Sequence, residues 1–121
     1  MSRRIETPVE LYHVLRRCWS VETGSKWLPD NPARGQCSVT SLVVHDVFGG
    51  EILKTRVGPY WHFYNRIGET RWDLTVSQFE VPIPFDDRPA SRDEVLADTS
   101  VEQYELLSRR MEEFLNADRQ R

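Results

Sequence analysis

Three short segments in the middle of the chain, separated by glycine-containing breaks, most constrain what this sequence can fold into. Residues 51–57 and 60–67 have the composition of strands and are separated by Gly58-Pro59, while residues 70–74 follow directly after Gly68-Glu69. Strands this close along the chain are joined by tight turns, and such turns make neighbouring strands antiparallel. The sequence therefore predicts a small antiparallel sheet, with residues 60–74 forming a hairpin.

Helical patterns precede and follow these strands. Thr7-Pro8-Val9-Glu10 combines a capping residue, a proline and a glutamate, and predicts a helix that runs to about Ser20. Residues 37–48 carry apolar side chains at helical spacing before Gly49-Gly50. Ser100 is positioned to cap a long final helix. The expected fold class is α+β, a small antiparallel sheet flanked by helices.

The remaining segments are shorter or irregular. Short helical turns are expected near residues 75–78 and 91–96, where capping patterns recur. The proline-bearing residues 81–90 are expected to cross the surface without regular structure. Residues 117–121 are expected to fray, as chain ends commonly do.

Length and charge narrow the classes of function. With 121 residues, residues 1–121 are expected to form a single domain. The 16 basic and 19 acidic side chains give a net charge of −3 without any basic run, which argues against nucleic acid as a partner. Neither a secretory signal nor a run of 18 apolar residues is present, so we expect a cytoplasmic protein with no membrane partner. The oligomeric state stays open.

Cysteine and histidine usage argues against a metal site. Cys18 and Cys37 form no CxxC pair, and His13, His45 and His62 are scattered without helical metal-ligand spacing. We therefore expect no metal, and the thiol chemistry considered below requires no cofactor. Cys18 lies on the apolar stripe of the first helix, which predicts a buried side chain rather than a reactive thiol.

A long loop is predicted between the first two helices. Residues 22–35 contain prolines, glycines, Asp30 and Asn31, which interrupt periodic structure. Loops of this length are uncommon in a small domain unless they cover or shape a site. Trp27 in this loop either anchors it onto the body of the protein or lines a substrate groove.

Three reactive side chains are predicted to converge. Cys37 begins the second helix, where unpaired N–H groups and the helix dipole stabilise a thiolate. Because side chains alternate along a strand, His62 and Asp73 share one hairpin face and Trp61 and Phe63 the other, which we expect to be the buried one. Whether directly opposite or diagonal, His62 and Asp73 would have Cβ atoms about 5–8 Å apart. The carboxylate could then orient the imidazole as in a catalytic triad.

Donors for an oxyanion are available beside the thiol. The backbone N–H of Cys37 and the side-chain amide of Gln36 are the candidates.

Each residue of the triad also has a purely structural explanation. The thiol can pack in the core, His62 can be hydrogen-bonded among aromatic rings, and Asp73 can cap the helical turn that follows it.

Four segments carry a resemblance to the YunG-like family of small bacterial proteins, and the likeness continues through residues 91–96 and the final helix. They are Gly35-Gln36-Cys37-Ser38-Val39-Thr40, Phe48-Gly49-Gly50-Glu51-Ile52, His62-Phe63-Tyr64-Asn65-Arg66 and Asp73-Leu74-Thr75-Val76-Ser77-Gln78-Phe79. The resemblance covers nearly the whole chain.

Cys37, His62 and Asp73 also resemble, more distantly, the transglutaminase-like and papain-like cysteine hydrolases. Those families place a cysteine at the start of a helix packed on an antiparallel sheet, with a histidine and an aspartate or asparagine on neighbouring strands. The resemblance implies a papain-like or transglutaminase-like core in which Cys37 is the nucleophile, His62 the base and Asp73 its orienter. This chain differs from those families because its candidate oxyanion glutamine, Gln36, lies directly beside the cysteine.

The expected function is thiol-dependent hydrolysis or acyl transfer at an amide or related acyl bond, by a peptidase, amidase, deamidase or acyl transferase. The substrate would be a peptide or a small acyl compound, with the loop 22–35 as one wall of the site and Trp27 and Tyr64 as substrate contacts. One alternative is a noncatalytic module that binds a peptide or small molecule and retains the fold. Another is a protein that docks a partner through its final helix.

Overall fold

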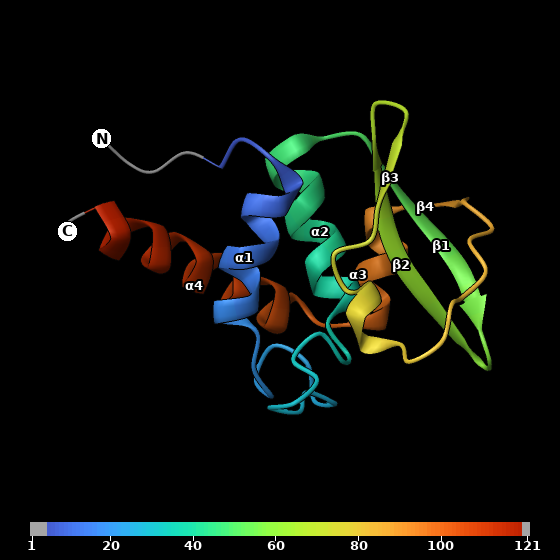
Figure 1. Ribbon diagram of the computed structural model, residues 1–121, viewed down its shortest axis with the longest axis horizontal. Coiled ribbons are helices and arrows are strands. Elements are labelled where there is room, and N and C mark those ends of the chain that lie inside the picture. The colour runs from blue at the N-terminus through green and yellow to red at the C-terminus, as the bar shows by residue number, and fades with distance from the viewer. Residues whose placement is uncertain (1–4, 120–121) are drawn as a thin grey trace.

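The computed structural model describes residues 5–119, which form a mixed α+β fold as predicted (Figure 1). Its elements follow the order α1 (Pro8–Cys18), α2 (Cys37–Phe48), β1 (Glu51–Val57), β2 (Tyr60–Ile67), β3 (Thr70–Trp72), the 3-10 helix η1 (Val76–Gln78), β4 (Arg88–Ala90), α3 (Arg92–Asp98) and α4 (Val101–Arg119).

The four strands form a small open antiparallel sheet in the order β3-β2-β1-β4. The predicted hairpin is present, but β3 ends at Trp72 and pairs only with residues 65–67 of β2. Along residues 60–64, β1 is the only strand within residues 5–119 that pairs with β2. That half of β2 therefore has a free edge, and the candidate site lies beside it.

The strand β4 was missed because residues 81–90 contain three prolines, which disfavour strands. Pro89 nevertheless pairs with Leu53 of β1. It is tolerated because β4 is the outer strand of the sheet, where one side of the backbone needs no ladder partner.

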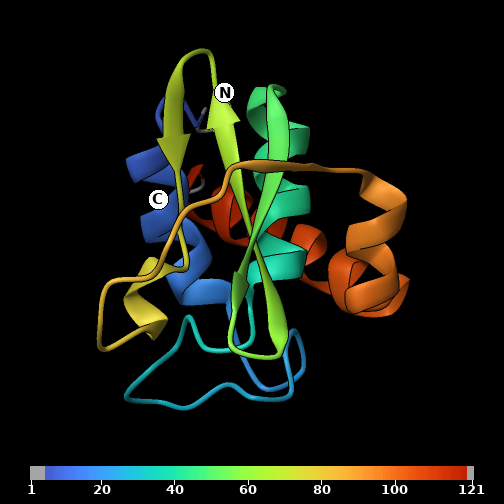
Figure 2. The same cartoon turned by 90° about the vertical axis from the view of Figure 1, so that its right-hand side faces the viewer.

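The helices α1, α2 and α4 gather on one side of the sheet, while the segment between η1 and β4 crosses the opposite face (Figures 1 and 2). One apolar cluster joins α1, α2 and α4, and includes Leu11, Val43 and Leu107. A second joins Leu42 and Val95 to the inward face of the sheet, including Phe63 as expected. The start of α2 is thereby held against the sheet.

Local signals fix the helix ends. The Thr7 side chain accepts a hydrogen bond from the backbone N–H of Glu10, and Gly49 ends α2 with a φ of +71°. The helix α1 ends at Cys18, slightly before the expected Ser20. The helix α4 continues through Arg119, so residues 117–119, expected to fray, are helical, while residues 120–121 lie outside the described part of the chain.

Cys18 is buried, as its place on the apolar stripe of α1 predicted. Its side chain is 5% exposed. Burial raises the pKa of the Cys18 thiol to about 11, although the positive charge of Arg110 opposes the shift. The thiol is therefore a packing group at neutral pH.

None of the helices in residues 5–119 is both long enough and apolar enough to cross a membrane.

Candidate active site

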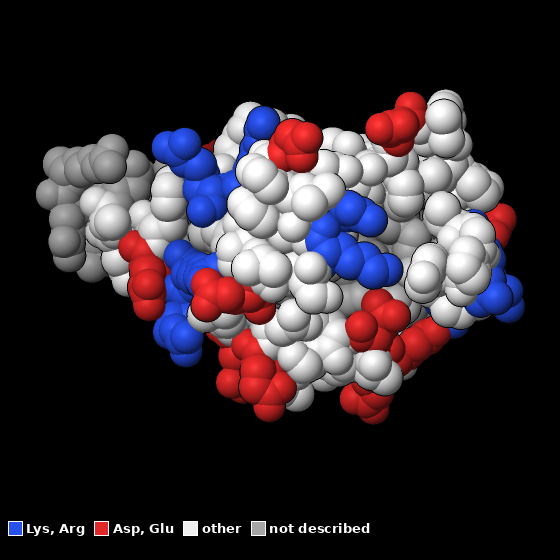
Figure 3. All heavy atoms as spheres, turned by 90° about the horizontal axis from the view of Figure 1, so that it is seen from below, with Lys and Arg blue, Asp and Glu red and all other residues white. Residues whose placement is uncertain are grey.

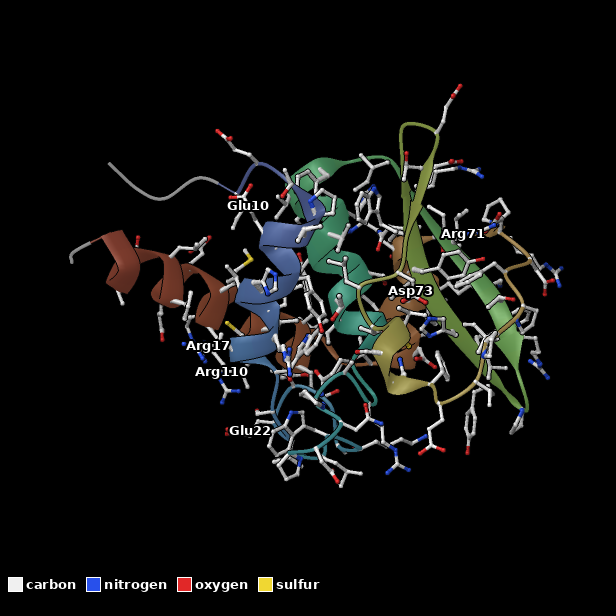
Figure 4. All side chains as sticks on the ribbon, in the orientation of Figure 1. Glu10, Arg17, Glu22, Arg71, Asp73 and Arg110 are labelled. Atoms are coloured by element: carbon white, nitrogen blue, oxygen red, sulfur yellow. The ribbon has the colours of Figure 1, made fainter. Side chains whose placement is uncertain are left out.

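His62 and Asp73 form a buried pair beside the free edge of β2. The Nε2 atom of His62 lies 2.6 Å from Oδ2 of Asp73, and the two side chains are 3% and 4% exposed. The pairing of Asn65 with Trp72 makes Asp73 the diagonal neighbour of His62 on one face of the hairpin, one of the two registers considered from sequence. Figure 4 shows Asp73 between β2 and η1.

Asp73 also serves the structural role that was its alternative explanation. Its second oxygen, Oδ1, accepts hydrogen bonds from the backbone N–H of Thr75 at 3.1 Å and from the Thr75 hydroxyl at 3.3 Å. These two bonds fix the carboxylate at the start of η1. One oxygen thus anchors the turn, and the other holds the imidazole.

The hairpin face that carries His62 is also covered, although the alternation along the strand predicted only the Trp61 and Phe63 face to be buried. Phe79 packs edge-on against the His62 ring at a centroid distance of 4.8 Å, and Tyr64 stacks at 5.9 Å. The segment that follows η1 provides this cover. The imidazole is therefore shielded from bulk water on this side.

The charge state of His62 is set by competing effects. Burial alone would lower its pKa, because an imidazolium loses hydration. Hydrogen bonds to Asp73 and Cys37, together with the charge of Asp73 and that of Cys37 in its thiolate form, outweigh burial and raise the pKa of His62 to about 9. The ring is therefore protonated at neutral pH. Because the Nε2 atom of His62 is hydrogen-bonded to Asp73, the ring nitrogen that can interact with the Cys37 sulfur is Nδ1.

Cys37 is the first residue of α2, is partly exposed, and lies within hydrogen-bonding reach of His62. Both side chains line one cavity of about 380 Å³. Asp73 lies behind the imidazole and is not part of the cavity lining. The structure thus brings the three predicted residues together, with the thiol partly exposed, the buried ring touching the cavity and the carboxylate enclosed behind it.

The start of α2 offers hydrogen-bond donors to the cavity. Gln36 provides no side-chain cap, and the first backbone bond at this end runs from the Thr40 N–H to the Gln36 carbonyl. The N–H groups of the first helical residues, Cys37 among them, have no partner within the helix. Cys37 and Ser38, two of these residues, line the cavity.

Gln36 has a different role from the expected oxyanion donor. Its side chain is fully buried, and its Nε2 donates to the carbonyls of Ser20 at 3.2 Å and Gly24 at 3.4 Å. Its Oε1 accepts from the Thr23 hydroxyl at 2.7 Å. The amide is occupied by the loop before α2, and it braces that loop instead of facing the cavity.

Trp27 and Tyr64 are not among the residues that line the cavity. Trp27 packs against the helical core and borders a separate depression with Phe114, so it anchors the loop, one of its two expected roles. Tyr64 is 1% exposed, and its hydroxyl donates to Asp87 at 2.9 Å and accepts from the Asp87 backbone N–H at 2.7 Å. Its hydroxyl holds the segment that covers His62.

The cavity also includes charged and polar residues that sequence reasoning did not single out. Ser38 donates a hydrogen bond to Asp98, and its hydroxyl lies 4.0 Å from the Cys37 sulfur. Lys26 and Arg34 line the wall formed by the loop. The loop was expected to form such a wall, but no local pattern marks Asp98, which comes from the distant end of α3.

Comparison with known proteins gives matches over most of the chain. The model of the YunG protein family matches residues 7–116. The Bacillus subtilis (strain 168) protein named "Uncharacterized protein YunG" is 44% identical over 105 residues, which cover 87% of this chain and 91% of that protein. No solved structure gives a significant match. The resemblance to transglutaminase-like and papain-like hydrolases therefore rests on the arrangement of the three residues alone.

Proposed function

The chain belongs to the YunG family, and we propose that it is a cysteine-dependent hydrolase or acyl transferase that acts on an amide or related acyl bond. Cys37 is the nucleophile, His62 the acid and base, and Asp73 the orienting carboxylate. The observation that carries the proposal is the shared cavity of thiol and imidazole, with the second ring nitrogen held by a buried carboxylate.

The electrostatics favour an ion pair in the resting site. Because the pKa of His62 is raised to about 9, its imidazolium can stabilise a Cys37 thiolate at neutral pH. The N–H groups at the start of α2 add a favourable field at the sulfur. Asp73 keeps the ring in one orientation and stabilises its positive charge.

The proposed reaction proceeds in two steps. The thiolate adds to the acyl carbon, and the carbonyl electron pair moves to oxygen, where the N–H groups of α2 stabilise it. Collapse of this intermediate breaks the bond to the leaving group, which takes the proton from His62. Water or another nucleophile then gives a proton to His62 and attacks the thioester, and the sulfur leaves as thiolate.

This arrangement is also the basis for proposing a distant relation to the transglutaminase-like and papain-like hydrolases. The order of cysteine at a helix start, histidine on a strand and aspartate after the neighbouring strand is compatible with that core. The occupied Gln36 amide departs from it, because the oxyanion would then depend on backbone donors alone.

An activated ester tests the proposal without knowledge of the natural substrate. With p-nitrophenyl acetate, the protein should release p-nitrophenolate in a burst and carry an acetyl group on Cys37, detected by peptide mass spectrometry. Cys37→Ala should abolish both signals, and His62→Ala should slow the burst. Cys18→Ala is the matched control, because its buried thiol lies outside the cavity.

The alternative of a noncatalytic binding module makes the opposite prediction. If Cys37→Ala releases p-nitrophenolate as fast as the unaltered protein, or if acetyl groups accumulate only on surface amines, the cysteine is not a nucleophile in this site. Either result would overturn the proposed function.

A further inference from the structure

We propose that the acyl substrate carries an anionic group, a carboxylate in the simplest case, which Lys26 and Arg34 bind at the entrance of the cavity. This inference rests on the proposed roles of Cys37 and His62 and adds the charge of the substrate to them. It comes from the wall of the cavity rather than from the reacting groups.

Two close backbone approaches bring Lys26 and Arg34 to the same wall. A Cβ atom on Gly24 would lie 2.5 Å from the carbonyl oxygen of Gly35, so the two arms of the loop touch there. Gly35 has a φ of +75°, and a Cβ on it would lie 2.9 Å from the Cβ of Lys26. Only glycine fits both positions without displacement. The crossing places Lys26 against the residue that follows Arg34.

The loop is held in this shape by buried hydrogen bonds. Thr23 is 1% exposed and Gln36 0% exposed, and their side chains join each other and the loop backbone. On the opposite side, the Lys26 ammonium lies 4.3 Å from the centroid of the Tyr60 ring, which also lines the cavity. The loop backbone and the Lys26 ammonium are thus preorganised, which lowers the entropic cost of binding an anion.

The balance of charge in the cavity is positive. Lys26 and Arg34 form no salt bridge with any carboxylate in the described residues 5–119, whereas the His62 imidazole is already paired with Asp73. The acidic side chain in the lining is Asp98, which accepts the hydrogen bond of Ser38. Two cations in a protein of net charge −3 are therefore left for a ligand.

The surface view agrees with this description. Figure 3 shows the molecule from below, which is the side on which the loop between α1 and α2 lies in Figure 1. In this view, Lys and Arg side chains lie beside a hollow. Acidic side chains lie on the lower side of this view, some of them close to the basic cluster.

The size of the cavity limits the substrate. A volume of about 380 Å³ is at the low end of the roughly 300–1,000 Å³ typical of small-molecule sites. A small amide or ester with a carboxylate fits this volume. The carboxylate would bind Lys26 and Arg34 while the acyl carbon meets the sulfur of Cys37.

Two alkylating reagents of similar shape and different charge test the inference. Iodoacetate is anionic and iodoacetamide is neutral, and each forms a carbon–sulfur bond to the thiolate with loss of iodide. The measured quantity is the rate constant of Cys37 with iodoacetate divided by its rate constant with iodoacetamide. This ratio is normalised by the same ratio for a neutral cysteine model compound. We expect this normalised ratio to exceed one by roughly three- to tenfold at low salt, and to fall as salt is added.

Variants assign the preference to the cationic wall. Lys26→Gln and Arg34→Gln should each lower the normalised ratio, and the double variant should bring it close to one. Arg16→Gln removes the same charge from α1, away from the cavity lining, and should retain the ratio. An unaltered protein with a ratio of one, or a double variant that keeps the full preference, would overturn the inference.

The two reagents also separate this inference from the proposed function. Rapid alkylation by iodoacetamide without a preference for iodoacetate would leave the nucleophile intact and reject the anionic substrate. Slow alkylation by iodoacetamide, at the rate of the model thiol, would reject the activated nucleophile, while the ratio would still report on the cationic wall.

Discussion

Replacing Asp73 by Asn removes the charge that holds His62 protonated while keeping an oxygen that can accept the Thr75 hydrogen bonds. In the unaltered protein the pKa of His62 is raised from 6.5 to about 9, mainly through hydrogen bonds to Asp73 and Cys37 that overcome burial. At 1.36 kcal/mol for each pH unit, this difference corresponds to about 3 kcal/mol of the free energy of unfolding. In Asp73→Asn, the neighbouring carboxylate is gone while burial still opposes protonation of the imidazole. The pKa of His62 should therefore fall well below 9.

The sign of the effect follows from proton linkage. A histidine whose pKa is higher in the folded state stabilises the fold fully below pH 6.5, and this contribution disappears as the pH rises through 9. Urea denaturation should therefore show that Asp73→Asn is less stable than the unaltered protein by up to about 3 kcal/mol at pH 6. The difference should shrink towards pH 9.5.

The comparison is internally controlled, because other groups such as Cys18 titrate in both proteins and cancel in the difference. A titration of the imidazole by NMR gives a second readout that does not depend on stability. A stability difference that is the same at pH 6 and pH 9.5, together with an unchanged imidazole titration, would refute the assigned ion pair.

Three further predictions concern the elements that support the site. Gln36→Ala should lower the free energy of unfolding by about 2–3 kcal/mol, because the Thr23 hydroxyl and two carbonyls lose their partner; a loss below about 0.5 kcal/mol in urea denaturation would contradict its bracing role. Gly24→Ala should lower the midpoint of thermal unfolding, since its Cβ would lie 2.5 Å from the carbonyl oxygen of Gly35; an unchanged midpoint would show that the crossing is loose. Iodoacetamide at pH 8 should label Cys37 and leave Cys18 unlabelled in the folded protein, as burial raises the pKa of Cys18 to about 11; equal labelling in peptide mass spectra would contradict that burial.

The helices and the central strands could be predicted because their signals are local. Thr7 caps α1 through a bond three residues away, and Gly49 ends α2 by adopting a backbone conformation that favours glycine. Alternation along β2 and the short turn after it are enough to predict that His62 and Asp73 share one face of the hairpin. Such features depend on few neighbours along the chain.

The residues whose structure or role differs from the prediction depend on distant parts of the chain. Gln36 is adjacent to the nucleophile in sequence, yet its amide turns towards Ser20 and Gly24, which only the folded loop brings near. Pro89 forms part of a strand because β1 lies beside it. Asp98 reaches the cavity from the end of α3, and the sequence has no local pattern for such a contact.

The most direct test of the account is the pH dependence of Cys37 alkylation by iodoacetamide in the presence and absence of His62. A free thiol with a pKa of about 8.5 is ionised to roughly one part in a hundred at pH 6.5. If the imidazolium stabilises the thiolate, Cys37 should react at least about tenfold faster than a free thiol at that pH, and His62→Ala should lose this advantage. A rate equal to that of a free thiol, rising only near pH 8.5 and unaffected by His62→Ala, would contradict the proposed catalytic site.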